Sequence, residues 1–424
     1  MFDLHKNLAR FWPTLTVAIL LAGFTLAAPF PASADSKKKK TGAAAPTHGP
    51  VDYSNIVWPN PPAIARIKYM AFYSAQPLKD LDKPSANSKQ GWMDRLAGTV
   101  PQSENSKPFF QLAQPYGMAV DTKGNLYVAD SKVGAIFIFN PETRDVAMIK
   151  NKVEAHFVRI IGLAMDDNDR LFVSDPGLKH VLVFNPQHKA EDVITDGLSE
   201  PSGLAIDVQN RLLYVSDVTL DQILVYDADT FKLLRKMGTT GKNHELTTPG
   251  DFAKPTGVAV DKDGNLYVCD TLNDRIEVFD ADGAFIRTWG KNGDGPGYFA
   301  RPKGVAIDSD GHIWVADGMQ DRVQVFSNEG QLLIVMGGHG LLPGQFQGLV
   351  SIASDNKRNR IYTSEIYPGR VQAFRYVTDA EFDQLRKERE QMRAASAPKS
   401  VAAPAPAAAQ AAPPQPAPQP AQPK

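Results

Sequence analysis

The sequence predicts an all-β fold, a six-bladed β-propeller whose last blade is completed by a strand from the N-terminal part of the chain. Three observations lead to this prediction. One motif occurs six times, its apolar residues alternate as they do in short strands, and the sixth copy lacks a strand that a segment near the N-terminus could supply. Copies begin about every 40 to 55 residues, which fits four short strands with their turns, and therefore one propeller blade.

The repeated motif combines a small-residue strand, a turn and an apolar strand that ends at a carboxylate. Its six copies are PYGMAVDTKGNLYVAD from Pro115, IIGLAMDDNDRLFVSD from Ile160, PSGLAIDVQNRLLYVSD from Pro201, PTGVAVDKDGNLYVCD from Pro255, PKGVAIDSDGHIWVAD from Pro302 and LVSIASDNKRNRIYTSE from Leu349. The glycine shared by the first five copies, replaced by Ser351 in the sixth, would permit close backbone approach in an innermost strand. The first Asp and the residues after it are typical of hairpin turns.

The second carboxylate of the motif is interpreted as structural, because a carboxylate at a strand end can accept hydrogen bonds from N–H groups of the following loop. Its six copies are Asp130, Asp175, Asp217, Asp270, Asp317 and Glu365. A bulky apolar residue also precedes every motif by three positions, and we expect it to pack between blades. These residues are Leu112, Phe157, Leu198, Phe252, Phe299 and Phe346.

The strand count predicts how the ring closes. Candidate fourth strands follow the first five motifs, at 145–150, 191–195, 232–237, 285–289 and 332–336. After the sixth motif the chain runs towards a helix-forming segment instead. Residues 65–72, which alternate like a strand, have no blade of their own. We therefore expect them to fill the gap in the last blade and to leave no open sheet edge there.

Both ends of the chain differ in composition from the repeats. Residues 1–34 are interpreted as a signal peptide, with Lys6 and Arg10 before an apolar core and Ala32-Ser33-Ala34 before the cleavage point. An uncleaved anchor is the alternative, because the apolar stretch is long enough to span a bilayer. Either reading predicts a periplasmic or extracellular body. If the signal is cleaved, no membrane insertion of the mature chain is expected.

The remaining boundaries follow from composition. Residues 35–60 are predicted to be a flexible linker, 61–378 the propeller, 379–396 a helix, and 397–424 a disordered tail rich in Ala, Pro and Gln. The chain holds 46 Lys and Arg against 47 Asp and Glu. This balance gives no field that would favour nucleic acid as a partner. The single cysteine, Cys269, cannot form an internal disulfide.

The pattern resembles the NHL repeat family over roughly 64–377. The best matches begin at Pro255, with PTGVAVDKDGNLYVCDTLNDRIEVFDADGAFIRTWG, and at Pro302, with PKGVAIDSDGHIWVADGMQDRVQVFSNEGQLLIVMG. The resemblance implies the propeller fold. It does not imply one function, because NHL propellers include members that bind proteins, members that bind RNA and enzymes.

Two groups of enzymes have similar propellers. Amidating lyases carry zinc-binding histidines between the Pro and Gly that open a repeat, and this sequence has no histidine there. Gluconolactonase-like propellers have a metal-binding glutamate near a Gly-Pro pair, which has no match here. No catalytic residue, metal site or cofactor is therefore predicted, although an enzyme with an unrecognised metal site stays an alternative.

The residues between Pro and Gly are the candidate ligand-binding positions, because they vary between repeats and should lie at the mouth of the channel. Those with polar groups are Tyr116, Ser202, Thr256 and Lys303. Variable groups on a rigid ring favour recognition. The sequence thus predicts an exported binding module for an envelope protein, peptide or glycan. The simpler interpretation is that these residues form a solvated rim.

Overall fold

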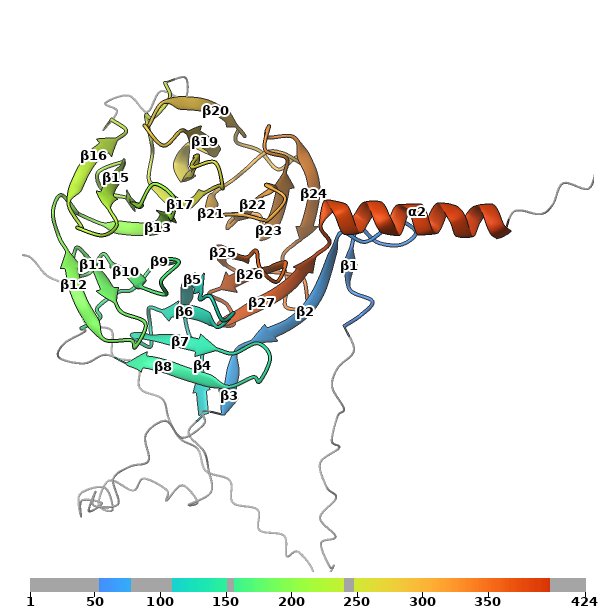
Figure 1. Ribbon diagram of the computed structural model, residues 1–424, viewed down its shortest axis with the longest axis horizontal. Coiled ribbons are helices and arrows are strands. Elements are labelled where there is room, and N and C mark those ends of the chain that lie inside the picture. The colour runs from blue at the N-terminus through green and yellow to red at the C-terminus, as the bar shows by residue number, and fades with distance from the viewer. Residues whose placement is uncertain (1–52, 78–108, 151–155, 240–247, 397–424) are drawn as a thin grey trace, which may run out of the picture. The chain divides into compact units, whose positions relative to one another are not determined.

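The structure, a computed structural model, describes residues 53–77, 109–150, 156–239 and 248–396. It is a six-bladed β-propeller, as the repeats predict. Figure 1 shows the blades arranged in a ring, each an antiparallel sheet with its first strand innermost. The predicted signal peptide and the Ala/Pro/Gln-rich tail lie outside the described residues.

The first five blades each contain four consecutive strands. The first three blades are β5 (Pro115–Val120), β6 (Leu126–Asp130), β7 (Ala135–Phe139) and β8 (Val146–Lys150), then β9 (Leu163–Met165), β10 (Leu171–Asp175), β11 (His180–Phe184) and β12 (Ala190–Ile194), then β13 (Pro201–Asp207), β14 (Leu212–Asp217), β15 (Gln222–Asp227) and β16 (Leu233–Met237). The next two are β17 (Pro255–Val260), β18 (Leu266–Asp270), β19 (Arg275–Phe279) and β20 (Phe285–Trp289), then β21 (Pro302–Ile307), β22 (Ile313–Asp317), β23 (Arg322–Phe326) and β24 (Leu332–Gly337). A short 3-10 helix, η1 (Thr271–Asn273), follows β18.

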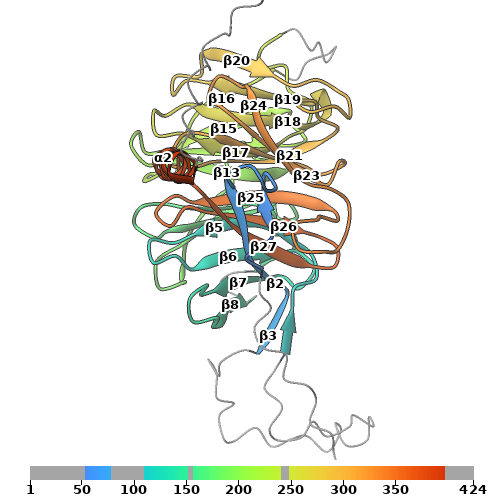
Figure 2. The ribbon, with the colours of Figure 1, turned by 90° about the vertical axis from the view of Figure 1, so that its right-hand side faces the viewer.

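The sixth blade confirms the predicted closure. It consists of β25 (Leu349–Asp355), β26 (Arg360–Glu365) and β27 (Arg370–Tyr376), with β2 (Ile67–Tyr73) paired antiparallel to β27. Figure 2 shows β2 and β27 from the side of the ring. The β2 side chains of Ile67 and Tyr69 are buried, so the strand contributes both backbone hydrogen bonds and core packing.

The predicted boundary at residue 60 needs correction. The short strand β1 (Val57–Trp58) pairs with β2 and makes the last sheet five-stranded. The ring of Tyr53 meets Tyr69 edge-on with 5.0 Å between centroids, and Trp58 meets Phe374 at 5.9 Å. Aromatic residues in 53–58 therefore belong to the folded domain, which sequence composition could not show. Strands β3 (Ala75–Pro77) and β4 (Phe109–Gln111) then form a separate hairpin-like pair.

The glycine and phenylalanine columns pack as expected. A Cβ atom on Gly162 would lie 2.0 Å from the carbonyl oxygen of Ser202 in the next blade, so only glycine allows this approach. Phe299 is fully buried and lies against Gly290, where φ is +98° and a Cβ would come within 2.5 Å of the ring. Backbone closeness at the axis and aromatic packing further out thus hold adjacent blades together.

The second carboxylates are structural, and they serve two loops rather than one. Asp130 is fully buried and accepts hydrogen bonds from Ala113 and Gln114, before the blade, and from Lys132 and Val133, after the strand. Because burial of an unpaired charge is costly, these donors explain why the carboxylate is tolerated. Through these hydrogen bonds Asp130 also connects two of the loops that surround the mouth of the channel.

The predicted helix is α2 (Asp379–Ser396), and its first turn contacts the propeller. Arg66 pairs with Asp379, and its guanidinium lies 4.4 Å from the ring centroid of Phe382. Arg375 pairs with Glu381 at 2.8 Å. No residue of α2 is buried. In the described residues, no helix is both long enough and apolar enough to cross a membrane.

Candidate functional site

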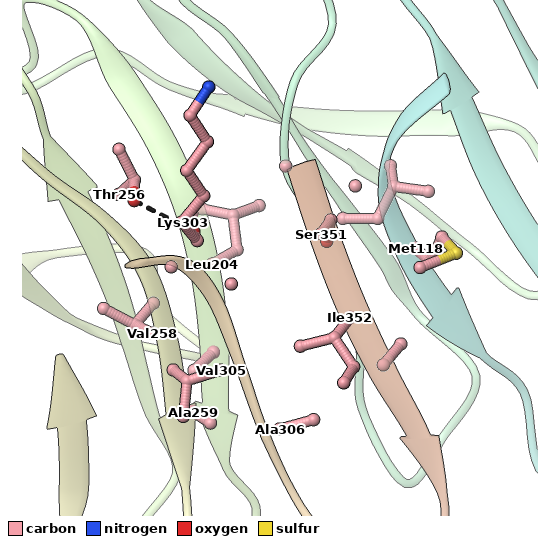
Figure 3. Close-up of a pocket in the computed structure, with 18 of the residues that line it drawn as sticks. Met118, Leu204, Thr256, Val258, Ala259, Lys303, Val305, Ala306, Ser351 and Ile352 are labelled. Carbon is pink, nitrogen blue, oxygen red and sulfur yellow. Dashed lines mark hydrogen bonds between the residues drawn. The ribbon is translucent and has the colours of Figure 1, made fainter. Parts of the chain in front are cut away.

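The innermost strands of the six blades surround a cavity of about 360 Å³ on the axis of the ring (Figure 3). This volume lies near the small end of ligand pockets, which are roughly 300–1,000 Å³. The cavity begins where the motifs begin, so the second residue of each motif, which lies between Pro and Gly in four of them, stands at its mouth. Tyr116, Ser202, Thr256 and Lys303, the predicted site residues, all line this cavity.

The carbonyl groups of the mouth residues are fixed by the preceding blade. Ser364 donates its hydroxyl proton to the oxygen of Tyr116, Ser174 to that of Ser202, and Ser216 to that of Thr256, at 2.5 to 2.6 Å. Two more of these carbonyl oxygens are hydrogen-bonded. That of Ile161 accepts a hydrogen bond from the backbone N–H of Gly117, and that of Lys303 accepts one from the hydroxyl of Thr256. The backbone at the mouth is therefore part of the scaffold, while the side chains are free to differ.

The three predicted hydroxyl groups are not equivalent. The Thr256 hydroxyl lies 2.7 Å from the Thr271 hydroxyl and 2.9 Å from the Lys303 oxygen, so its proton is used within the scaffold. Thr256 is thus a positioning residue rather than a donor to a ligand. In the part of the chain that the structure describes, the hydroxyls of Ser202 and Tyr116 have no hydrogen-bond partner. Burial raises the pKa of Tyr116, so it stays protonated.

Lys303 is the one charged residue among those that line the cavity. Its aliphatic stem crosses Gly318, where an added Cβ would lie 2.9 Å from Cδ and 3.1 Å from Cε. Figure 3 shows its ammonium group extending away from Val305 and Ala306, which lie deeper in the cavity. Burial lowers the pKa of Lys303, with Arg301 acting in the same direction and Asp317 and Asp321 opposing it.

Below the mouth the cavity wall is apolar. Much of it is supplied by the residue that follows the motif glycine, or Ser351 in the sixth blade, and in all six blades that residue is an aliphatic residue or a methionine. These are Met118, Leu163, Leu204, Val258, Val305 and Ile352. The sequence shows this column but does not show which of its side chains face the channel, so these residues were not among the predicted site residues.

The cavity does not fit the metal centres of the enzyme groups considered above. Its lining residues offer no carboxylate, imidazole or thiolate, which are the usual protein ligands of zinc and of hard cations. Among the described residues, one group elsewhere could contact a metal ion, Asp308, Asp310 and His312 in a hairpin turn. There the His312 ring contacts Asp308 at 3.1 Å. Asn125 and Asn265 make the corresponding bond to Asp121 and Asp261 in other blades, so the contact belongs to the turn.

The loops around the mouth expose large apolar side chains. Val133, Leu178, Leu272, Met319 and Tyr367 follow the second strands of five blades, and we call them the apolar crown. Met319 and Tyr367 are 70% and 60% exposed. Tyr367 lies close enough to Tyr116 to affect its ionisation, and Met319 follows Gly318, which contacts Lys303. In the turns of the opposite face, among described residues, Val208 alone is an exposed large apolar residue.

Comparisons with known proteins give partial matches. Residues 174–293 match the family described as SMP-30/Gluconolactonase/LRE-like region, and residues 254–391 match a family described as 6-bladed beta-propeller. A probable peptidyl-alpha-hydroxyglycine alpha-amidating lyase of Caenorhabditis elegans is 41% identical over 88 residues. That match covers 20% of this chain and 23% of the lyase.

Two solved structures that resemble the chain have low sequence identity to it. Hydrazine synthase of Kuenenia stuttgartiensis has a TM-score of 0.47 at 14% identity, covering 66% of this chain and 100% of that one. A gluconolactonase of Xanthomonas campestris has a TM-score of 0.48 at 21% identity, covering 62% and 88%. The geometry and the family match together identify the chain as a six-bladed β-propeller protein with a segment similar to the SMP-30/gluconolactonase region.

Proposed function

We propose that this propeller is of the NHL type and is a binding module that recognises a protein or peptide through the mouth face. The observation that carries the proposal is the apolar crown. Five loops from separate blades bring exposed aliphatic, methionine and tyrosine side chains to the face that surrounds the cavity. Exposed apolar residues gathered on one face, opposite a face with almost none, are typical of interaction sites.

The composition of the crown favours a protein or peptide over a glycan. Four of its five side chains are Val, Leu or Met, which cannot donate or accept the hydrogen bonds that sugar hydroxyls require. Met is common at adaptable binding surfaces, and Tyr is enriched in protein interfaces. The hydrogen-bonded backbone carbonyl groups of the mouth residues hold the crown loops in place, which reduces the conformational entropy lost on binding.

The test compares capture of envelope proteins by the full chain and by variants. Met319→Glu and Tyr367→Glu place charges in the crown and should abolish capture of any specific partner. Leu333→Glu is the matched control, because Leu333 is 47% exposed on the outer strand β24, away from the mouth. Melting temperatures should show that all three variants fold. Unchanged capture by both crown variants would rule out this surface as the binding site.

An enzyme is the second candidate, favoured by the similarity to the amidating lyase and to the gluconolactonase region. No metal ligand lines the cavity, and its ionisable side chains are Lys303 and Tyr116. Burial lowers the pKa of Lys303 towards neutrality and raises that of Tyr116 away from it, which favours Lys303 for acid–base chemistry. Turnover of a peptidyl-hydroxyglycine or a lactone by wild type and not by Lys303→Met would favour the enzyme. The binding proposal predicts no turnover by either.

A further inference from the structure

Lys303 stands at the boundary between an apolar cavity and the solvent. Its ammonium group has no ion-pair or hydrogen-bond partner among the described residues, and no other charged side chain lines the cavity. The nearby carboxylates are already engaged. Asp317 accepts from the backbone of Ala300 and Met319, and Asp321 accepts from Gly348.

A partly desolvated cation without an ion-pair partner is unfavourable, because water no longer solvates it fully and Asp317 and Asp321 attract it without forming an ion pair. The position is nevertheless built into the scaffold. The backbone oxygen of Lys303 is held by Thr256, and Gly318 leaves the space in which the stem lies. A ligand that brings one negative charge to this point would remove the electrostatic cost and gain a charge-assisted hydrogen bond.

The surroundings limit what else that ligand can be. Val258, Val305 and Ile352 form an apolar wall below the mouth, and the Ser202 and Tyr116 hydroxyls are free at its rim. One lysine suits a single negative charge better than a dianion, for which several cations or an N-terminal helix dipole would be expected. A volume of about 360 Å³ admits a small apolar body.

We propose that the cavity binds a monocarboxylate with a compact apolar body, its carboxylate on Lys303 and its body against the wall of Val258, Val305 and Ile352. This inference rests on the proposed binding function and names the chemistry recognised at its centre. The carboxylate could belong to a small free acid or to the C-terminus of a peptide held by the crown. Both present the same group to Lys303.

Calorimetric titration of the full chain with hexanoate and with hexanamide tests the charge, because the two differ little in shape. We expect hexanoate to bind at least tenfold more tightly, and chain lengthening from butanoate to hexanoate to increase affinity. Lys303→Met keeps an apolar stem of similar length and should reduce hexanoate binding at least tenfold while leaving hexanamide binding unchanged. Lys262→Met, in a hairpin turn of the opposite face, is the matched control and should bind as wild type does.

A second arm assigns the source of the carboxylate. Short valine-rich peptides with a free C-terminus are compared with the same peptides amidated, and a preference for the free acid that depends on Lys303 would indicate a peptide end. Equal affinity for hexanoate and hexanamide, no binding of any acid, or unchanged hexanoate binding by Lys303→Met would each overturn the inference. The crown variants report separately on the proposed function, since partner capture could be lost in Met319→Glu whether or not hexanoate binds.

Discussion

The hydroxyl of Ser364 donates a hydrogen bond of 2.6 Å to the carbonyl oxygen of Tyr116, and this bond joins the last blade to the first. Ser174 and Ser216 make the same bond within the ring. The mouth of the cavity is therefore continuous across the point where the two ends of the domain meet. The bond also orients the backbone of a residue whose side chain lines the site.

Replacing Ser364 by alanine should lower the free energy of unfolding by about 1 kcal/mol, because a buried carbonyl loses its donor. Alanine itself fits this position, as Ala129 and Ala316 stand there in two other blades. Thermal and denaturant unfolding measure the change. Ser202→Ala removes a free hydroxyl from the same ring and should melt as wild type does. If the two variants were equally stable, the bond would contribute nothing to ring closure.

Truncation tests the closure and the corrected domain boundary. Relative to a chain that starts at Tyr53, one that starts at Pro61 loses the packing of Tyr53 and Trp58 and should be less stable by about 3 kcal/mol. A chain that starts at Ala75 also loses β2, which exposes the edge of β27, and should not give a cooperative melt. A chain starting at Ala75 that melts like the longest form would disprove the closing role of β2.

The buried carboxyl group of Glu277 should make the free energy of unfolding depend on pH. It is fully buried, accepts a bond from Gly250 N, and occupies the position that Gln324 and Gln372 hold in the next two blades, where they accept from Gly297 N and Gly344 N.

Burial raises the pKa of Glu277 to about 7, with Arg275 opposing the rise. The folded state therefore holds a proton that the unfolded chain loses near pH 4.5, and stability falls as pH rises from there to about 7.

Glu277→Gln should remove this penalty. The variant should be more stable than wild type at pH 8, by up to roughly 3 kcal/mol, and nearly equal to it at pH 4. Denaturant unfolding at the two pH values measures the difference. A variant less stable than wild type at pH 8 would mean that the attraction between Glu277 and Arg275 outweighs the cost of burial.

The turn at Asp308 to His312 gives a test for metal. His312→Asn reproduces the residue found in two other blades, and at pH 8 it should change stability by no more than about 0.5 kcal/mol. The hydrogen bond to Asp308 raises the pKa of His312. Wild type should therefore gain stability over the variant as pH falls from 8 through the raised pKa of folded His312, and the gain should be complete once pH lies below 6.5, the ordinary pKa of histidine. EDTA should not alter either melting temperature. A stabilisation by Zn²⁺ or Mn²⁺ that requires His312 would instead establish a metal site.

We propose that the chain is exported, on the basis of its N-terminal residues, and this gives the last prediction. Mature protein from the native envelope should begin near Asp35, following Ala32-Ser33-Ala34. Mass spectrometry of the N-terminal peptide measures the start. Intact Met1 in the membrane fraction would replace cleavage by anchoring.

The sequence by itself determined the fold, the phase of the blades and the closure by an N-terminal strand. It could do so because a blade makes most of its strand pairs within one repeat, so every copy carries the same local pattern. The fourth strands and the start of α2 lie within one or two residues of their predicted positions. The four predicted site residues also line one cavity, since equivalent positions of a repeat must converge at the axis of a ring.

Only the tertiary structure decided what those residues can do. Thr256 and Ser202 look alike in the sequence, yet the hydroxyl of Thr256 is bonded to the neighbouring blade and that of Ser202 is free. Among the described residues Lys303 forms no ion pair, because the nearby carboxylates of Asp317 and Asp321 accept hydrogen bonds from backbone N–H groups. The apolar crown brings together residues from five repeats. Such features arise between repeats, where distances depend on how blades pack, and one repeat's sequence does not encode its neighbour's contacts.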